Sequence, residues 1–74
     1  MTTEAKFLKD FGSRIAELRK KRHLTQEQLA DIVSLHRTYI GFIEQGKRNP
    51  SVGNINKIAA GLEVSLKELF KPFS

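Results

Sequence analysis

The sequence predicts an all-α fold in which residues 1–74 form a single domain of five short helices around one core. Apolar residues recur at intervals of three and four, which is the period of a helix with one buried face. No stretch alternates long enough to indicate a strand, and no Asn-Gly or Asp-Gly pair marks a hairpin. The two prolines, Pro50 and Pro72, lie outside the helical patterns.

The first predicted helix covers about residues 3–22, and its basic end suits the negative end of the helix dipole. Apolar side chains spaced four, four and three residues apart form its buried stripe: Phe7, Phe11, Ile15 and Leu18. We therefore expect both phenylalanines in the core and not on a base-stacking surface. Other cations of this helix are interpreted as a solvated face, with phosphate contact as the alternative: Arg14, Lys20, Lys21 and Arg22.

The second predicted helix covers about residues 25–33, because Thr25 and Gln28 form a capping-box pattern at its start. Ala30 is small, which lets a neighbouring helix approach closely. A very short turn follows, in which Leu35 is apolar and can fill the junction between two helices.

The third predicted helix covers about residues 36–45, with Gly46 as its C-cap. Two helices of this length joined by so short a turn, over residues 25–45, have helix-turn-helix geometry. In that motif the second helix enters the major groove of DNA. The sequence therefore predicts a DNA-binding surface centred on the third helix.

Serine residues mark the starts of the last two predicted helices. Ser51 can cap a fourth helix over residues 52–61, whose apolar positions include Val52, Ile55, Ile58, Ala59 and Leu62. Ser65 and Glu68 form another capping-box pattern, which opens a fifth helix over residues 66–70 that stops before Pro72.

The charge of the chain favours an anionic partner. Thirteen Lys and Arg residues face eight Asp and Glu residues, so the net charge is +5. Clusters at residues 19–22 and 47–48 favour a phosphate-binding surface, although a solubilising surface has the same composition. The absence of cysteine excludes disulfides and fits a cytoplasmic protein. No segment has the length of a membrane span, and the polar start lacks a signal peptide.

Catalysis is not expected of this chain. Glu27, Asp31 and His36 are residue types used in general acid–base chemistry, but so small a domain has no room for a deep pocket. No nucleophile motif, phosphate-cradling glycine-rich loop or metal-ligand spacing is present. We therefore predict no enzyme activity, no metal and no cofactor.

Much of the chain, from about residue 11 to 70, resembles the lambda-repressor-like family, also called the Cro/C1 or XRE type. The matching segments are Leu24-Thr25-Gln26-Glu27-Gln28-Leu29-Ala30, Leu35, Arg37-Thr38-Tyr39-Ile40, Ile43-Glu44-Gln45-Gly46-Lys47-Arg48-Asn49-Pro50-Ser51 and Ile58-Ala59-Ala60-Gly61-Leu62-Glu63-Val64. The resemblance implies the five-helix lambda-repressor-like fold and sequence-specific binding to double-stranded DNA.

The resemblance also implies individual roles. Base edges would be contacted by Arg37, Thr38 and Phe42; arginine can donate two bonds to guanine, whereas phenylalanine offers a thymine methyl only apolar contact. Phosphate contacts, which set orientation, would come from Gln26, His36, Tyr39, Gln45, Lys47 and Arg48. A core position is the alternative for Tyr39. Arg19 and Glu44 would form a partly buried structural salt bridge.

Departures from the family pattern occur around the helix-turn-helix. Ser34 and His23 stand where glycine is common, and a positive φ at His23 would bring modest strain. His36 stands at an N-cap position usually held by Ser, Thr or Asp, and histidine is a weaker cap. Gly41 has two open interpretations, a tolerated surface glycine or room for DNA.

A homodimer is expected because one helix contacts too few base pairs to specify a site. Two-fold dimers place their DNA-contacting helices about 34 Å apart on a palindromic operator. Residues 65–74 are the predicted dimer surface, because the apolar side chains near this end exceed what one short helix can bury: Val64, Leu66, Leu69, Phe70 and Phe73.

The predicted function is transcriptional regulation by a homodimer on a palindromic operator. The segments Arg37-Thr38-Tyr39-Ile40 and Arg48-Asn49 most resemble the small controller proteins of restriction–modification systems, and phage Cro-type repressors are also similar. The alternative class is a protein-interaction helix-turn-helix module such as an antitoxin, which an apolar Phe42 on the third helix favours. The operator sequence, activation or repression, and contact with a partner such as RNA polymerase do not follow from these residues.

Overall fold

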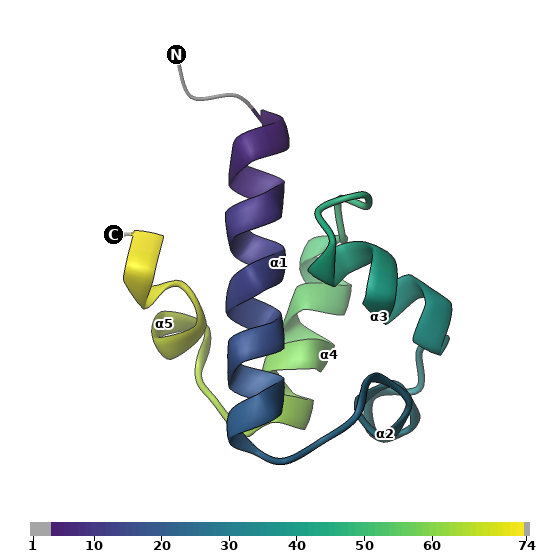
Figure 1. Cartoon of the computed structure of the whole chain (residues 1–74). Helices are drawn as coiled ribbons and strands as arrows, with labels where there is room; N and C mark the ends of the chain where they lie inside the picture. The colour runs from purple at the N-terminus through teal and green to yellow at the C-terminus, as the bar shows by residue number, and fades with distance from the viewer. Residues whose placement is uncertain (1–3, 74) are drawn as a thin grey trace.

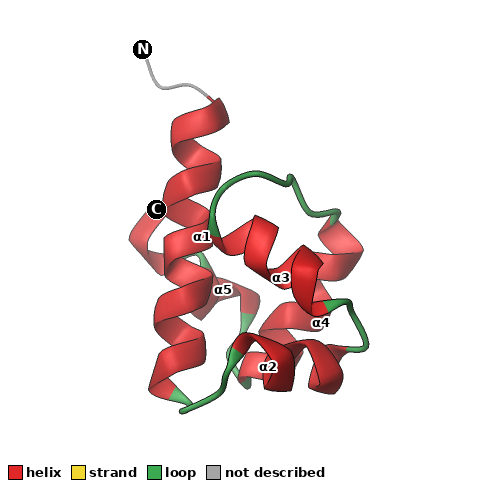
Figure 2. Ribbon diagram, turned by 45° about the vertical axis from the view of Figure 1, so that its right-hand side comes forward, coloured by secondary structure: helices red, strands yellow, loops and turns green. Residues whose placement is uncertain are grey.

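Five α-helices and a short 3₁₀ helix make up the computed structural model, which describes residues 4–73 (Figure 1). The elements are α1 (Glu4–Lys21), α2 (Gln26–Val33), α3 (Arg37–Glu44), α4 (Val52–Leu62), α5 (Leu66–Leu69) and η1 (Lys71–Phe73). No strand occurs among the described residues, so the predicted all-α class is confirmed (Figure 2). Within the same range, no helix combines the length and apolarity needed to cross a membrane.

Side-chain caps begin four of the helices: Thr25 for α2, His36 for α3, Ser51 for α4 and Ser65 for α5. Thr25 Oγ1 accepts a bond from Gln28 N at 3.0 Å, and Gln28 Oε1 accepts one from Thr25 N at 2.8 Å, which completes the predicted capping box. Ser51 caps α4 as predicted. Ser65 Oγ accepts from Glu68 N at 3.0 Å, but the predicted box is only half formed, because the Glu68 carboxylate lies 3.2 Å from an α1 arginine.

Several helix boundaries differ from the prediction by one residue. His36 and Gln45 are the N-cap and the C-cap of α3 and do not belong to the helix. Gly46, which was predicted as the C-cap, lies one residue after Gln45 and has φ +77°. Helix α4 runs on to Leu62. Pro72 lies inside η1, which was not predicted. Thr3, the expected start of the first helix, and Ser74 lie outside the described residues.

Helix α1 divides the domain into two sides. Helix α3 packs against α1, and α2 packs against both α3 and α4. In Figure 1, α5 and the C-terminal end lie on one side of α1, whereas α2 and α3 lie on the other. The helix-turn-helix and the predicted dimer segment are therefore separated by α1.

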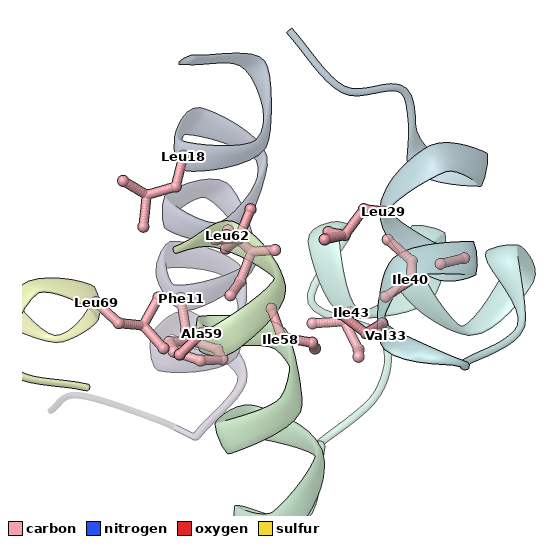
Figure 3. Packing of buried hydrophobic residues seen from close by; sticks show 12 residues of the cluster. Phe11, Leu18, Leu29, Val33, Ile40, Ile43, Ile58, Ala59, Leu62 and Leu69 are labelled. Atoms are coloured by element: carbon pink, nitrogen blue, oxygen red, sulfur yellow. The ribbon is translucent and has the colours of Figure 1, made fainter. Parts of the chain in front are cut away.

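All five helices contribute to one apolar core (Figure 3). Its buried side chains in the described chain are Phe11, Ile15, Leu18, Leu29, Ala30, Val33, Ile40, Ile43, Ile58, Ala59, Leu62 and Leu69. The stripe predicted on the first helix fails at one end, because Phe7 is 40% exposed near the N-terminal end of α1, beyond the other helices. Val52 is also exposed, because it starts the first turn of α4.

Two glycines allow helices to touch. A methyl group on Gly12 would collide with the backbone oxygens of Ile43 and Glu44, so α1 and α3 meet backbone to backbone. A methyl group on Gly61 would collide with Val33 Cγ1, where α4 meets α2. These contacts place the C-terminal end of α3 against α1 and the C-terminal end of α2 against α4.

The cations of α1 do not all belong to a solvated face. Lys20 and Lys21 are exposed as predicted. The prediction is wrong for Arg14, whose side chain is buried against α5, and for Arg22, whose Nη1 donates to Gly61 O at 2.6 Å. Both arginines donate to carbonyls at helix C-terminal ends, which have no partner within their own helix.

Candidate DNA-binding face

The predicted helix-turn-helix is formed by α2, the turn at residues 34–36 and α3. Ser34 has φ 59°, in the left-handed region where glycine is favoured, and ends α2 as its C-cap. Leu35 is half-buried in the junction, and its N–H donates to Ala30 O at 3.0 Å. His23 also has φ 59°. A positive φ at this position was the condition under which we expected modest backbone strain before α2.

A buried ion pair joins α1 to the end of α3. Arg19 Nε donates to Glu44 Oε2 at 2.7 Å, and Arg19 Nη2 donates to Glu44 Oε1 at 3.0 Å. The side chains are 11% and 6% exposed, and the remaining guanidinium edge donates to Leu24 O at 2.7 Å. The salt bridge expected between these two residues is therefore present, and its two parallel bonds fix its geometry.

Gln26 connects the start of α2 to the same carboxylate. Its Nε2 donates to Glu44 Oε1 at 3.0 Å, and its side chain covers Gly41. Gly41 is buried, so it is not a tolerated surface glycine, but it also lines the groove between α2 and α3, so room for DNA stays a prediction. A methyl group at Gly41 would lie at ordinary contact distance, 3.5 Å from Gln26 Oε1.

One open groove of about 630 Å³ lies between α2 and α3. The predicted base-contacting residues all line it, together with two predicted phosphate ligands: Arg37, Thr38, Phe42, Gln26 and Gln45. Arg37 Nη1 lies 3.7 Å from Glu27 Oε1, but both side chains are 67% exposed, so solvent screens this pair. Phe42 is 38% exposed, so part of its ring is accessible from the groove. His36, Tyr39, Lys47 and Arg48 lie outside the groove lining.

His36 acts as the N-cap of α3. Its Nδ1 accepts a bond from Thr38 N at 3.1 Å. Because Nδ1 must be unprotonated to accept this bond, the neutral imidazole carries its proton on Nε2. The side chain is exposed, so this remaining N–H can meet an anion while the cap is intact.

Tyr39 combines features of the two predicted positions, a phosphate contact and a place in the core. It is half-buried against the core, and its hydroxyl oxygen accepts a bond from Asn54 Nδ2 at 3.1 Å. The Arg48 guanidinium carbon lies 5.3 Å from the ring centroid, within the range of a cation–π contact. The hydroxyl proton is left available for an outside acceptor. Asn54 was not predicted, because it lies 15 positions further along the chain on another helix.

The loop after α3 presents its cations from a fixed position. Lys47 and Arg48 are exposed, and Lys47 N donates to Phe42 O at 2.8 Å. Asn49 Nδ2 donates to Glu4 Oε2 at 3.3 Å, which attaches the loop to the first turn of α1. The loop therefore places two positive charges beside the exposed end of α3.

The predicted dimer residues divide into buried and accessible groups. Leu69 is 0% exposed and belongs to the core, so its assignment to the dimer surface is wrong. Leu66 is 42% exposed, and half-buried side chains adjoin it in sequence: Val64, Phe70 and Phe73. Phe73 is not isolated, because its ring lies 5.3 Å from that of Phe7. Phe7 was missed as a member of this surface because its helical spacing matched the core stripe.

Comparisons with known proteins agree with this architecture. A helix-turn-helix family model matches residues 15–69. Control protein C.MunI from a Mycoplasma species is 51% identical over 61 residues, which cover 81% of this chain and 82% of that protein.

Solved structures include similar proteins. The restriction-modification controller protein C.AhdI from Aeromonas hydrophila has a TM-score of 0.86 at 45% identity, covering 88% of this chain and 98% of its own. The tetramer of the controller protein C.Esp1396I, in complex with its natural 35 base-pair operator, has a TM-score of 0.82 at 37% identity, covering 88% and 86%. The chain therefore belongs to the lambda-repressor-like, XRE-type helix-turn-helix family, and it is similar to the controller proteins of restriction–modification systems.

Proposed function

We propose that this protein is a homodimeric transcriptional regulator of the controller type, which binds a palindromic operator with α3 in the major groove. The observation that carries the proposal is the exposed groove side of α3, fixed from beneath by the buried bonds among Arg19, Gln26 and Glu44. Polar side chains on a rigid support can meet base edges without losing much conformational freedom on binding.

Sequence discrimination is assigned to three side chains of α3. Arg37 can donate two parallel bonds to guanine, and Thr38 can bond a base edge or contact a thymine methyl. Phe42 offers apolar contact only, which suits a thymine methyl at the edge of the groove. The operator preference is therefore expected to depend most on Arg37.

Orientation on the duplex is assigned to phosphate contacts around α3. The proposed donors are Gln26, His36, Tyr39, Gln45, Lys47 and Arg48. His36 would use its Nε2–H and Tyr39 its hydroxyl proton, because the other hydrogen-bonding capacity of each is already occupied. Lys47 and Arg48 add charge, so binding should weaken as salt rises.

Dimerisation is assigned to the surface formed by Val64, Leu66, Phe70 and Phe73, with Phe7 beside it. Leu66 is 42% exposed and the other three side chains are half-buried, and α5 lies on the side of α1 away from α3 in Figure 1. A second copy presenting the same surface would bury it across a two-fold axis. Where the operator lies beside a promoter, RNA polymerase is the further partner that such a regulator would meet.

Selection from random duplex DNA tests the proposal. Bound sequences are amplified, and affinity for the enriched site is compared with that for random duplex at several salt concentrations. We expect a palindrome, a specificity ratio of roughly 10³ or more, and a steep loss of affinity with salt. Weak binding without an enriched site would overturn the proposal.

A protein-interaction role is the second candidate, and the exposed Phe42 favours it. An apolar ring on the outer side of α3 suits a protein partner as well as a thymine methyl. The variant Phe42→Ala separates the two roles. If Phe42 contacts a thymine methyl, the substitution should change the preference at only one symmetric base pair of the selected site. The second candidate would lead if selection enriched no site at all.

A further inference from the structure

We infer that Arg14 is a positioning residue for dimerisation, because it fixes the C-terminal segment of α5 and η1 on α1 in the geometry that a second copy meets. The inference rests on the proposed dimer. According to this inference, the buried guanidinium of Arg14 on α1 sets the orientation of the proposed dimer surface, most of which lies on α5 and η1.

Helix α5 needs an external support. It contains four residues, Leu66–Leu69, and so short a helix is not stable by itself. Its last carbonyls have no partner further along a helix, because η1 follows at once. The segment is held by the buried Leu69 side chain, by its contact with α4 and by the groups of α1 that bond to it.

Arg14 supplies part of this support through Nε and Nη2, whereas its Nη1 bonds within α1. Its Nε donates to Leu69 O at 3.2 Å, and its Nη2 donates to Glu68 O at 2.7 Å. The same Nη2 lies 3.2 Å from Glu68 Oε2, and Nη1 donates to Glu17 Oε1 at 3.0 Å. The residue is 8% exposed, so solvent does not compete strongly for these bonds. A cation is also favoured at the negative end of a helix.

Aromatic contacts beside Arg14 attach the same segment in a different way. The Phe11 and Phe70 rings stack with centroids 5.3 Å apart, and Phe73 contacts Phe7 at the same distance. Phe7, Phe11 and Arg14 follow one another at helical spacing on α1. Ring contacts tolerate sliding, whereas bonds to two successive carbonyls define one register. We therefore assign attachment to the rings and orientation to Arg14.

Arg22, one residue beyond the end of α1, offers a control with the same kind of bonds, and its side chain is 32% exposed compared with 8% for Arg14. Its Nη1 donates to Gly61 O at 2.6 Å, and its Nη2 lies 3.4 Å from Glu63 Oε2. It thus supports the C-terminal end of α4 as Arg14 supports that of α5. Most of the proposed dimer surface, namely Leu66, Phe70 and Phe73, lies on α5 or follows it, and Val64 alone adjoins the end of α4, so we expect dimerisation to depend on Arg14 and not on Arg22.

Sedimentation equilibrium of Arg14→Met and Arg22→Met tests the inference, because methionine keeps much of the apolar stem but donates no bond. We expect Arg14→Met to raise the dimer dissociation constant by about tenfold or more, since it removes charge-assisted hydrogen bonds. Its affinity for a duplex with one half-site should match wild type, and its affinity for the full palindrome should fall. Arg22→Met should lower thermal stability and leave dimerisation unchanged.

Amide hydrogen exchange provides a second measurement. Phe70 N donates to Leu66 O at 3.0 Å and Phe73 N to Phe70 O at 2.9 Å, so these amides report the order of the segment. Arg14→Met should lower their protection and spare the amides of α3. An unchanged dissociation constant in a folded Arg14→Met protein would overturn the inference.

A second variant and the oligomeric state of the wild-type protein keep the test of Arg14 decisive. If Arg14→Met does not fold, Arg14→Lys replaces it, because lysine keeps the charge but cannot span two carbonyls with fixed geometry. Wild-type dimerisation in Arg14→Lys would then overturn the inference. If the wild-type protein is a monomer, the dimer part of the proposed function is overturned. If the wild-type protein is a dimer, and Leu66→Asp dissociates it but Arg14→Met does not, only the role of Arg14 is overturned.

Discussion

On the α3 side of α1, the exposed groove is lined mainly by polar side chains that are supported by directional bonds, whereas on the α5 side the accessible apolar side chains are supported by ring contacts together with the hydrogen bonds of Arg14. Arg19, Gln26 and Glu44 form a buried set of hydrogen bonds beneath α3. The rings of Phe11, Phe70 and their neighbours fill the corresponding place beneath the C-terminal segment. DNA recognition depends on the accurate placement of a few donors, and association of two copies depends on matched apolar area.

The difference also separates what each side can tolerate. A polar support fails when one partner is removed, because the other is left as an unpaired buried charge. An apolar support loses stability gradually with the area and volume removed. Variants on the two sides should therefore differ in kind as well as in size.

The largest effect is expected where the C-terminal segment enters the core. Leu69→Asp should lower the free energy of unfolding by about 4 kcal/mol or more, because it removes a buried side chain and buries a carboxylate. Leu66→Asp, at a side chain that is 42% exposed, should leave the monomer folded and dissociate the dimer. Circular dichroism on heating and sedimentation separate the two results. Equal loss of folding in both variants would contradict this division of the segment.

The next effect is expected at the buried ion pair. Arg19→Met should destabilise the domain by about 3 to 5 kcal/mol, because it leaves the Glu44 carboxylate buried with only Gln26 as a side-chain partner. The double variant Arg19→Met with Glu44→Met should recover much of this loss, because no charge is stranded. Chemical denaturation of the three proteins measures the coupling. Additive losses in the double variant would show that the pair does not act as a unit.

The two sides were not equally predictable from sequence. The helix-turn-helix followed from local signals, such as the capping pair Thr25 and Gln28, and the family resemblance implied the pairing of Arg19 with Glu44. The starts of α4 and α5 were predicted at the observed residues, because caps are short-range interactions, whereas α2 and α3 start one residue after their predicted starts. The ends of α3 and α4 were displaced by one residue each, because C-terminal ends depend on the φ angles of single residues such as Glu63.

The α5 side was harder because periodicity does not show which residues a neighbouring segment will cover. Phe7 and Leu69 exchanged their expected places, since Phe7 extends beyond the other helices and Leu69 faces the core. Arg14 looked like any other cation of an amphipathic helix, and its acceptors are carbonyls 54 and 55 positions away. The contact between Tyr39 and Asn54 was invisible for the same reason.

A smaller effect is expected within the groove itself. Arg37→Ala should weaken binding by about 1 to 3 kcal/mol on the selected operator and relax preference at one symmetric base pair. Lys47→Ala should weaken all duplexes alike and reduce the salt slope by about 1. Repeating the selection with each variant distinguishes base contact from phosphate contact. An unchanged preference in Arg37→Ala would assign discrimination elsewhere on α3.

The smallest effect is expected at the cap of α3, where stability and DNA contact can be separated. His36→Ala removes the acceptor of Thr38 N and should cost about 1 kcal/mol of stability. His36→Ser keeps a capping oxygen and should restore that stability, but it lacks the outward Nε2–H. Operator affinity should therefore stay reduced in His36→Ser if the imidazole meets a phosphate. If His36→Ser recovers full operator affinity together with stability, His36 acts only as the cap of α3. The whole contribution of His36 to binding would then come from the accurate placement of α3.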